Sequence, residues 1–126
     1  MPQLPTSVKQ PVDQLTFREW SKILSKTVSA AIESNVKRRF RRYAVSGETR
    51  GEYQYDDQQF KRSWPLLEVS AHGLTLKSHE ELPSGAMLKI QVNFDGNWYP
   101  LRGRIVHSTC CLGGFKVGIK LIFPDG

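Results

Sequence analysis

Hydrophobic residues in the first third of the chain recur at steps of three and four, the spacing that places them on one face of an α-helix. These residues are Phe17, Trp20, Leu24, Val28, Ala31 and Ile32. The segment Thr16–Glu19 has the S/T-x-x-E form of a capping box, in which each end bonds to a backbone N–H of the other. We therefore expect one long N-terminal amphipathic α-helix over residues 15–36, after a flexible lead-in over residues 1–14.

From residue 42 onward, apolar and polar residues alternate, which is typical of β-strands with one buried face. Asp95-Gly96 predicts a hairpin with a type I′ turn, because both central residues of that turn need a positive φ. Short strands with turn residues between them indicate a mainly β protein, a small antiparallel barrel over residues 37–124. Extended segments are expected over residues 42–55 (with a break near 46–47), 64–70, 74–78, 88–94, 98–107 and 115–123, and a polar loop over 56–63.

The apolar stripe of so long a helix must be covered by something. The sequence leaves three partners open: the protein's own barrel, a second copy of the chain in a homodimer, or a membrane surface. Arg18, Lys22 and Lys26 line a second face of the helix, which solvation explains as well as lipid binding does.

Composition narrows the class of protein. The chain has no run of eighteen apolar residues and no secretion signal, so neither a membrane span nor export is expected. Its two cysteines, Cys110 and Cys111, are adjacent, which fits neither a disulfide framework nor a metal site. We therefore expect a cytoplasmic protein, and its net charge of +6 favours an anionic partner.

A cationic cluster lies where the helical pattern ends and the strands begin. Its members are Lys37, Arg38, Arg39, Arg41 and Arg42. These charges repel one another in any fold, so the cluster suggests a polyanionic partner, such as a molecule with phosphate groups. Charge alone fits a solvated basic surface or a nucleic-acid-binding tail equally well.

A second constellation lies at residues 67–73. Glu68 and Ser70 are two residues apart on a predicted strand, so both point to one face while Leu67 and Val69 point to the core. Gly73 permits a backbone conformation that is closed to residues with a Cβ. Taken alone, the segment also fits an ordinary hairpin with two solvent-facing polar side chains.

Together, the two constellations resemble the PilZ domain family over roughly residues 37–123. Arg38 and Arg42 match the family's Arg-x-x-x-Arg pair, and Arg39 matches a commonly seen extra arginine. Ser70 and Gly73 match the second motif, Asp/Asn-x-Ser-x-x-Gly. Further segments that match are Tyr43-Ala44-Val45, Leu74-Thr75-Leu76, Leu101–Val106 and Val117–Phe123.

The resemblance implies a six-stranded antiparallel PilZ-like β-barrel that binds the bacterial second messenger cyclic di-GMP. An arginine fork binds a phosphate or the O6 and N7 acceptors of guanine, and a carboxylate accepts from its N1–H and N2–H₂ edge. The sequence has no recognisable combination of a nucleophile, a base and an orienting group, so we do not expect an enzyme. No histidine has metal-ligand spacing, and we expect no metal and no cofactor. The implied ligand site consists of Lys37, Arg38, Arg39, Arg42, Glu68, Ser70 and Gly73.

Glu68 departs from the family's pattern, which has Asp or Asn at this position. Its carboxylate reaches about 1.5 Å further, so it must bend back or displace the base. A misplaced charge-assisted hydrogen bond would cost roughly ten- to a hundredfold in affinity.

We therefore expect a cyclic di-GMP receptor or adaptor in which ligand binding moves the N-terminal segment, and a partner protein senses the change. The alternative is a degenerate PilZ-like module that has lost the ligand and acts only in protein–protein interaction, for example in pilus or motility machinery. A nucleic-acid-binding barrel ranks last, because the exposed strand faces carry few aromatic residues on which bases stack.

Overall fold

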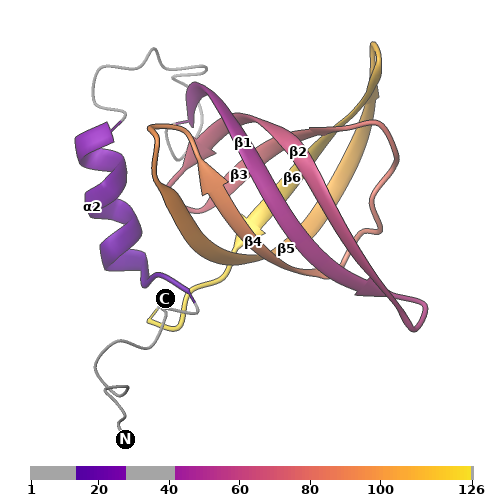
Figure 1. The fold of residues 1–126 in the computed structure, drawn as a ribbon, viewed down its shortest axis with the longest axis horizontal. Helices are drawn as coiled ribbons and strands as arrows, with labels where there is room; N and C mark the ends of the chain where they lie inside the picture. Colours follow the sequence, from indigo (N-terminus) through magenta and orange to yellow (C-terminus); the bar gives the residue numbers. More distant parts are fainter. Residues whose placement is uncertain (1–13, 28–41, 126) are drawn as a thin grey trace, which may run out of the picture.

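Six antiparallel strands close into a barrel in the order β1-β2-β3-β6-β5-β4 (Figure 1). The computed structural model describes residues 14–27 and 42–125; residues 1–13, 28–41 and 126 lie outside the description. The described elements are α2 (Phe17–Thr27), β1 (Arg42–Tyr55), β2 (Gln58–Ser70), β3 (Gly73–Ser78), β4 (Met87–Asn93), β5 (Trp98–Cys111) and β6 (Gly114–Leu121). The predicted mainly β fold, a six-stranded antiparallel barrel preceded by a helix, is confirmed.

The barrel interior is filled by the apolar half of each alternating strand pattern. The fully buried residues include Leu66, Leu76, Leu88, Ile90, Leu101, Ile105 and Val117. Gly51 leaves room for the ring of Trp64, because a Cβ at position 51 would lie 2.6 Å from that ring. This packing fixes the strand register, because a slip of one residue would turn a whole row of buried side chains outward.

Three strands contain a register shift, where an extra residue reverses the alternation beyond it. The shifts lie between Ala44 and Gly47 in β1, Leu66 and Glu68 in β2, and Ile105 and His107 in β5. The first is the break predicted near residue 46. On either side of the second shift the buried residues are Leu66 and Val69, and Leu67 is only half-buried, so the expectation that Leu67 points to the core is wrong.

Two of the predicted turns differ from those observed. The polar loop expected over residues 56–63 is wrong: Asp56 and Asp57 alone form the turn, both with positive φ (55° and 63°), and β2 begins at Gln58. The polar residues after the turn belong to the exposed part of the β1–β2 hairpin. Because this part has no alternation of apolar and polar residues, the sequence pattern does not identify it as a strand. The Asp95-Gly96 hairpin is present, but only Gly96 has a positive φ (96°), so its turn is not type I′.

α2 begins as the capping box predicts. The backbone N–H of Thr16 donates to Glu19 Oε1 at 2.9 Å, and the N–H of Glu19 donates to Thr16 Oγ1 at 3.1 Å. Asp125 accepts from the N–H of Phe17 at 2.7 Å, which brings a carboxylate to the positive end of the helix and lowers the pKa of Asp125. Residues 28–36, the rest of the predicted helix, lie outside the described residues.

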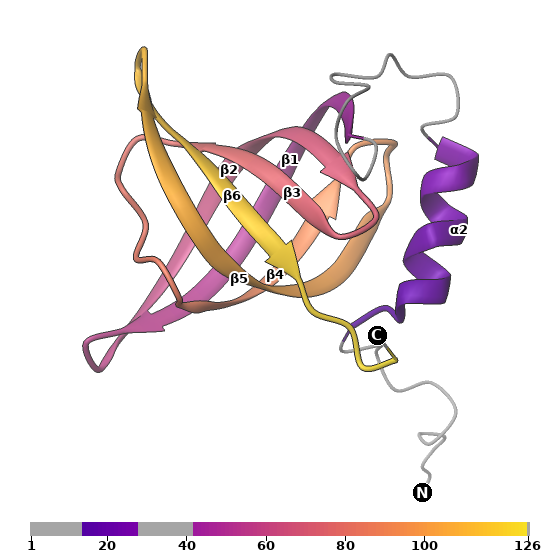
Figure 2. The ribbon, with the colours of Figure 1, turned by 180° about the vertical axis from the view of Figure 1, so that it is seen from behind.

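α2 lies beside one end of the barrel in both views (Figures 1 and 2), and its buried residues are the apolar Trp20 and Leu24. Trp20 is fully buried there, with its ring edge-on to Phe94 (centroids 6.0 Å apart) and Tyr99 (6.2 Å). The protein's own barrel therefore covers the described part of the helix, one of the three arrangements left open by the sequence. Within residues 14–27 and 42–125, no helix is long and apolar enough to cross a membrane.

Candidate ligand-binding site

Four of the seven predicted site residues line one hollow on the outside of the barrel: Arg42, Glu68, Ser70 and Gly73. The hollow has a volume of about 660 Å³, and the rest of its wall consists of Val69, His72 and residues of β3, β5 and β6. Arg42 lies opposite Ser70 in the β1–β2 ladder, so the start of β1 and the end of β2 meet at the hollow. The other three predicted residues, Lys37, Arg38 and Arg39, lie outside the described residues.

Glu68 is held in place by its neighbours on both sides. The register shift in β2 sets Glu68 opposite Thr75 of β3, and Thr75 Oγ1 donates to Glu68 Oε1 at 3.2 Å. The Arg42 guanidinium lies 3.8 Å from the same oxygen, and its side chain is 43% exposed. An ion pair this long and this exposed contributes little to stability, so a ligand can replace it at small cost.

The Ser70–Gly73 turn closes on itself. The N–H of Gly73 donates to Ser70 Oγ at 3.0 Å, and Ser70 Oγ donates to the Gly73 carbonyl at 3.2 Å. A Cβ on Gly73 would lie 2.9 Å from the carbonyl oxygen of Ile119 in β6. Glycine is needed here because two strands approach closely, whereas its φ is not among the positive values that favour glycine.

α2 contacts this turn directly. The indole N–H of Trp20 donates to the Ser70 carbonyl at 3.0 Å in a buried position. The ring of Phe17 stacks on the imidazole of His72 with centroids 5.0 Å apart, and the His72 carbonyl accepts from the N–H of Leu121 at 2.8 Å. The helix and the turn of the second motif therefore form one packed unit.

The sequence did not identify the far wall of the hollow. The wall residues that it missed include Thr75, His107, Lys116, Gly118 and Lys120. Alternation places Thr75 and the three β6 residues on an outer face, but it does not say which strands are neighbours. No pattern in the sequence indicated that His107 lies in this wall, because the β5 bulge that turns its side chain outward cannot be recognised from the hydrophobic pattern.

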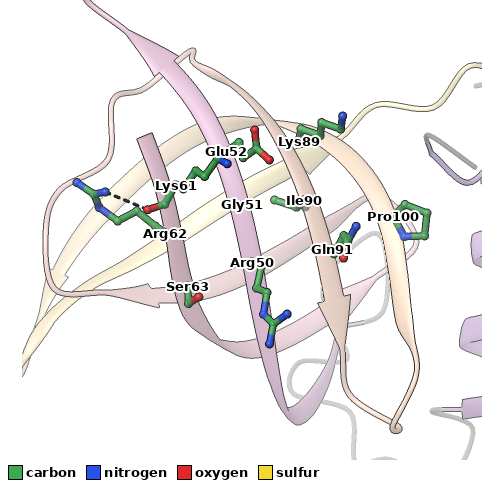
Figure 3. A pocket seen from close by; sticks show the side chains of 10 residues that line it. All are labelled: Arg50, Gly51, Glu52, Lys61, Arg62, Ser63, Lys89, Ile90, Gln91 and Pro100. Carbon is green, nitrogen blue, oxygen red and sulfur yellow. Dashed lines mark hydrogen bonds between the residues drawn. The ribbon is translucent and has the colours of Figure 1, made fainter. Parts of the chain in front are cut away.

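A second hollow, of about 650 Å³, lies on another part of the outer surface, along β1, β2 and β4 (Figure 3). It contains none of the predicted site residues. Arg62 donates to Glu80 at 2.8 Å and to the Lys61 carbonyl at 3.0 Å, while the Arg50 guanidinium lies 4.3 Å from the centroid of the Trp98 ring. Since protein groups already engage these guanidiniums, we regard this hollow as a solvated face of the sheet.

The chemistry offered by the candidate site is hydrogen bonding and charge. Among residues 14–27 and 42–125, no group of three or more His, Cys, Asp and Glu residues lies in a position to hold a metal ion. The thiols of Cys110 and Cys111 are free and lie at the end of β5, outside the hollow.

Comparison with protein families adds an independent finding. The model of one family, described as the PilZ domain, matches residues 36–125. This range contains the cationic cluster, the Glu68–Gly73 segment and all six strands of the barrel. No curated protein matches the chain.

Proposed function

Because the chain belongs to the PilZ domain family, a family of ligand-binding adaptor domains that includes receptors for cyclic di-GMP, we propose that it binds cyclic di-GMP in the hollow beside Arg42 and Glu68. The observation that carries the proposal is the meeting of an arginine, a carboxylate and the Ser70–Gly73 turn around one hollow. Lys37, Arg38 and Arg39 would reach the same ligand from the segment before β1. In this role the protein is a cytoplasmic receptor.

The groups around the hollow match the groups of the ligand, which has two phosphates and two guanine bases. The Arg42 guanidinium offers a planar fork for a phosphate or for the O6 and N7 edge of guanine. The Glu68 carboxylate offers acceptors for the N1–H and N2–H₂ donors. Its hydrogen bond to Thr75 supports a side chain bent back against β3, an arrangement that would accommodate the extra methylene group of glutamate.

Binding would be transmitted through the Ser70–Gly73 turn. A ligand that shifts this turn also changes the hydrogen bond from Trp20 and the stacking of Phe17 on His72. Both contacts hold α2 on the barrel, so the position of the helix depends on ligand. We propose that a partner protein, or a second copy of the chain that pairs through the helix, senses this change.

The test is calorimetric titration of the full chain with cyclic di-GMP, with GTP and cyclic GMP as nucleotide controls. We expect micromolar or tighter binding of cyclic di-GMP alone. Arg42→Ala should weaken it roughly ten- to a hundredfold, because it removes a charge-assisted hydrogen bond. The matched control is Arg50→Ala, on the same strand but outside the hollow. Absence of binding at tens of micromolar ligand, or equal losses in the two variants, contradicts the proposal.

One observation favours the alternative, a degenerate module that acts only in protein–protein interaction. Glu68 already has protein partners, Thr75 and Arg42, so its carboxylate is occupied within the chain. Glu68→Asp separates the two functions. A large gain in affinity over a wild type that hardly binds would identify the natural chain as degenerate, whereas similar affinities would show that glutamate serves the site.

A further inference from the structure

The β1–β2 hairpin extends past the barrel wall at the end opposite α2 (Figures 1 and 2). Among the described strands, β4 accompanies β1 only as far as Tyr53, and β3 accompanies β2 only from Leu66 onward. Residues 54–59, which we call the arm, therefore pair only with one another. Every residue of the arm is exposed, so its faces and its tip are open to a partner.

The tip of the arm carries two adjacent carboxylates in a backbone conformation that suits other residues better. Asp56 and Asp57 have φ values of 55° and 63°, in the left-handed region that few non-glycine residues adopt. Asn-Gly is the usual sequence for a turn with two positive φ values, and neighbouring carboxylates also repel one another. Turn formation alone therefore does not explain the two aspartates, which indicates a role for their charge.

The outer face of the same hairpin becomes cationic toward the barrel. In the second hollow, Glu52 lies between Lys61 of β2 and Lys89 of β4 (Figure 3). The next residue along this row is Arg102 of β5, directly opposite Lys89, and like charges in such a pair are destabilising. Three cations thus accompany one carboxylate in the row. The face is solvated in a single chain, and its excess of positive charge suits an acidic partner.

The spacing between the tip and this row fits a second copy of the same hairpin. Glu52 lies four residues before Asp56, about 13 Å along the strand. When two hairpins lie face to face in opposite directions, each tip can therefore lie over the cationic row of the other. The midpoint falls at Gln54 and its ladder partner Gln59, two exposed amides that can bond to their counterparts across a two-fold axis.

We infer that the chain forms a two-fold dimer through this hairpin, in which the Asp56–Asp57 tip of each copy lies against Lys61 and Lys89 of the other. Such an interface is isologous, so it closes as a dimer. Two short hairpins bury less surface than a stable interface needs, so the dimer is weak and sensitive to salt. It uses no residue of the hollow beside Arg42, and the inference does not rest on the proposed function.

The first test is sedimentation velocity of the full chain without ligand, from about 10 μM to about 1 mM protein. We expect wild type to shift from monomer toward dimer over this range. The shift should shrink as salt rises from about 0.1 M to about 1 M, because the Debye length falls from about 10 Å to about 3 Å. A wild type that stays monomeric throughout would overturn the inference.

Charge reversal then locates the contact. Asp56→Lys/Asp57→Lys and Lys61→Glu/Lys89→Glu should each raise the dissociation constant of the dimer roughly tenfold or more, because each sets like charges against one another. An equal mixture of the two variants should dimerise as wild type does, since every tip then meets a row of opposite charge. Losses that mixing does not restore would overturn the pairing of tip and row.

Two further variants separate this contact from folding and from the helix. Asp56→Asn/Asp57→Gly removes both carboxylates and supplies the usual turn sequence, so it should weaken the dimer without lowering the midpoint of thermal unfolding. Lys22→Glu/Lys26→Glu makes the matched change of charge on the exposed face of α2 and should dimerise as wild type does. A dimer that only the α2 variant dissociates would place the contact at the helix and overturn the inference.

Discussion

The hydroxyl of Thr49 lies inside the barrel, fully buried, and no described residue forms a hydrogen bond with it. An unsatisfied buried polar group costs about 1–3 kcal/mol. Its neighbours across the two adjacent strands are Trp64 and Val92, both buried and apolar. At the residue scale, then, the Thr49 hydroxyl is a polar group in the core that does not contribute to stability.

Thr49→Val should therefore raise the free energy of unfolding by about 1 kcal/mol, because valine keeps the shape of threonine and removes the hydroxyl. Denaturant unfolding measures this as a higher midpoint with an unchanged slope. Thr75→Val is the matched control: its hydroxyl donates to Glu68, so its loss should not stabilise the protein. A lower midpoint for Thr49→Val would show that the hydroxyl has a partner after all.

At the scale of elements, the β4–β5 hairpin is fastened by side chains rather than by a tight turn. Asn97 N–H donates to Asp95 Oδ1 at 3.0 Å, and the hydroxyl of Tyr99 donates to Asp95 Oδ2 at 2.5 Å. Burial, and then the hydrogen bond and charge of Asp95, raise the pKa of Tyr99 to about 12. The same tyrosine packs against Trp20 of α2, so this hairpin also supports the helix.

The pKa of Tyr99 predicts how stability depends on pH. The folded state favours the protonated phenol, whose pKa is near 10 in an unfolded chain. The stabilisation is therefore complete below pH 10 and is lost as the pH rises through about 12. The difference in unfolding free energy between wild type and Tyr99→Phe should shrink between pH 10 and 12. Other tyrosines, such as Tyr53, are present in both proteins, so their contributions cancel in this difference. A constant difference over this range would contradict the raised pKa.

Local chemistry explains which elements the sequence revealed. The capping box predicted the start of α2, and alternation of apolar residues identified the strands apart from the exposed arm at residues 58–63, because both signals lie within a few consecutive residues. The bulges at residues 67 and 106 were not predicted, since they arise from the pairing of distant strands. For the same reason the sequence predicted one side of the candidate site, at Glu68 and Ser70, and missed the wall on β5 and β6.

At the scale of the whole molecule, the candidate site and the helix share one end of the barrel. The N–H of Leu15 donates to the Pro100 carbonyl at 2.9 Å, and Gln14 donates to the carbonyl of Ile122. Trp20 adds its bond to the Ser70 carbonyl. The segment before the barrel is thus tied to β5, to the chain after β6 and to the turn of the second motif, and these contacts are the physical basis of the coupling between ligand and helix that we propose.

The measurement that tests this account most directly is a map of backbone and indole N–H chemical shifts as cyclic di-GMP is added to the full chain. We expect shifts at residues 68–75 and at Gly118, together with the indole N–H of Trp20. The N–H groups of the distant β1–β2 turn, at residues 54–59, should stay in place and serve as the internal control.

A map with shifts along the face of β1, β2 and β4 instead, or with no shifts at saturating ligand, would contradict the assigned site. Shifts at residues 68–75 with an unmoved Trp20 indole would confirm the site and contradict the coupling to α2.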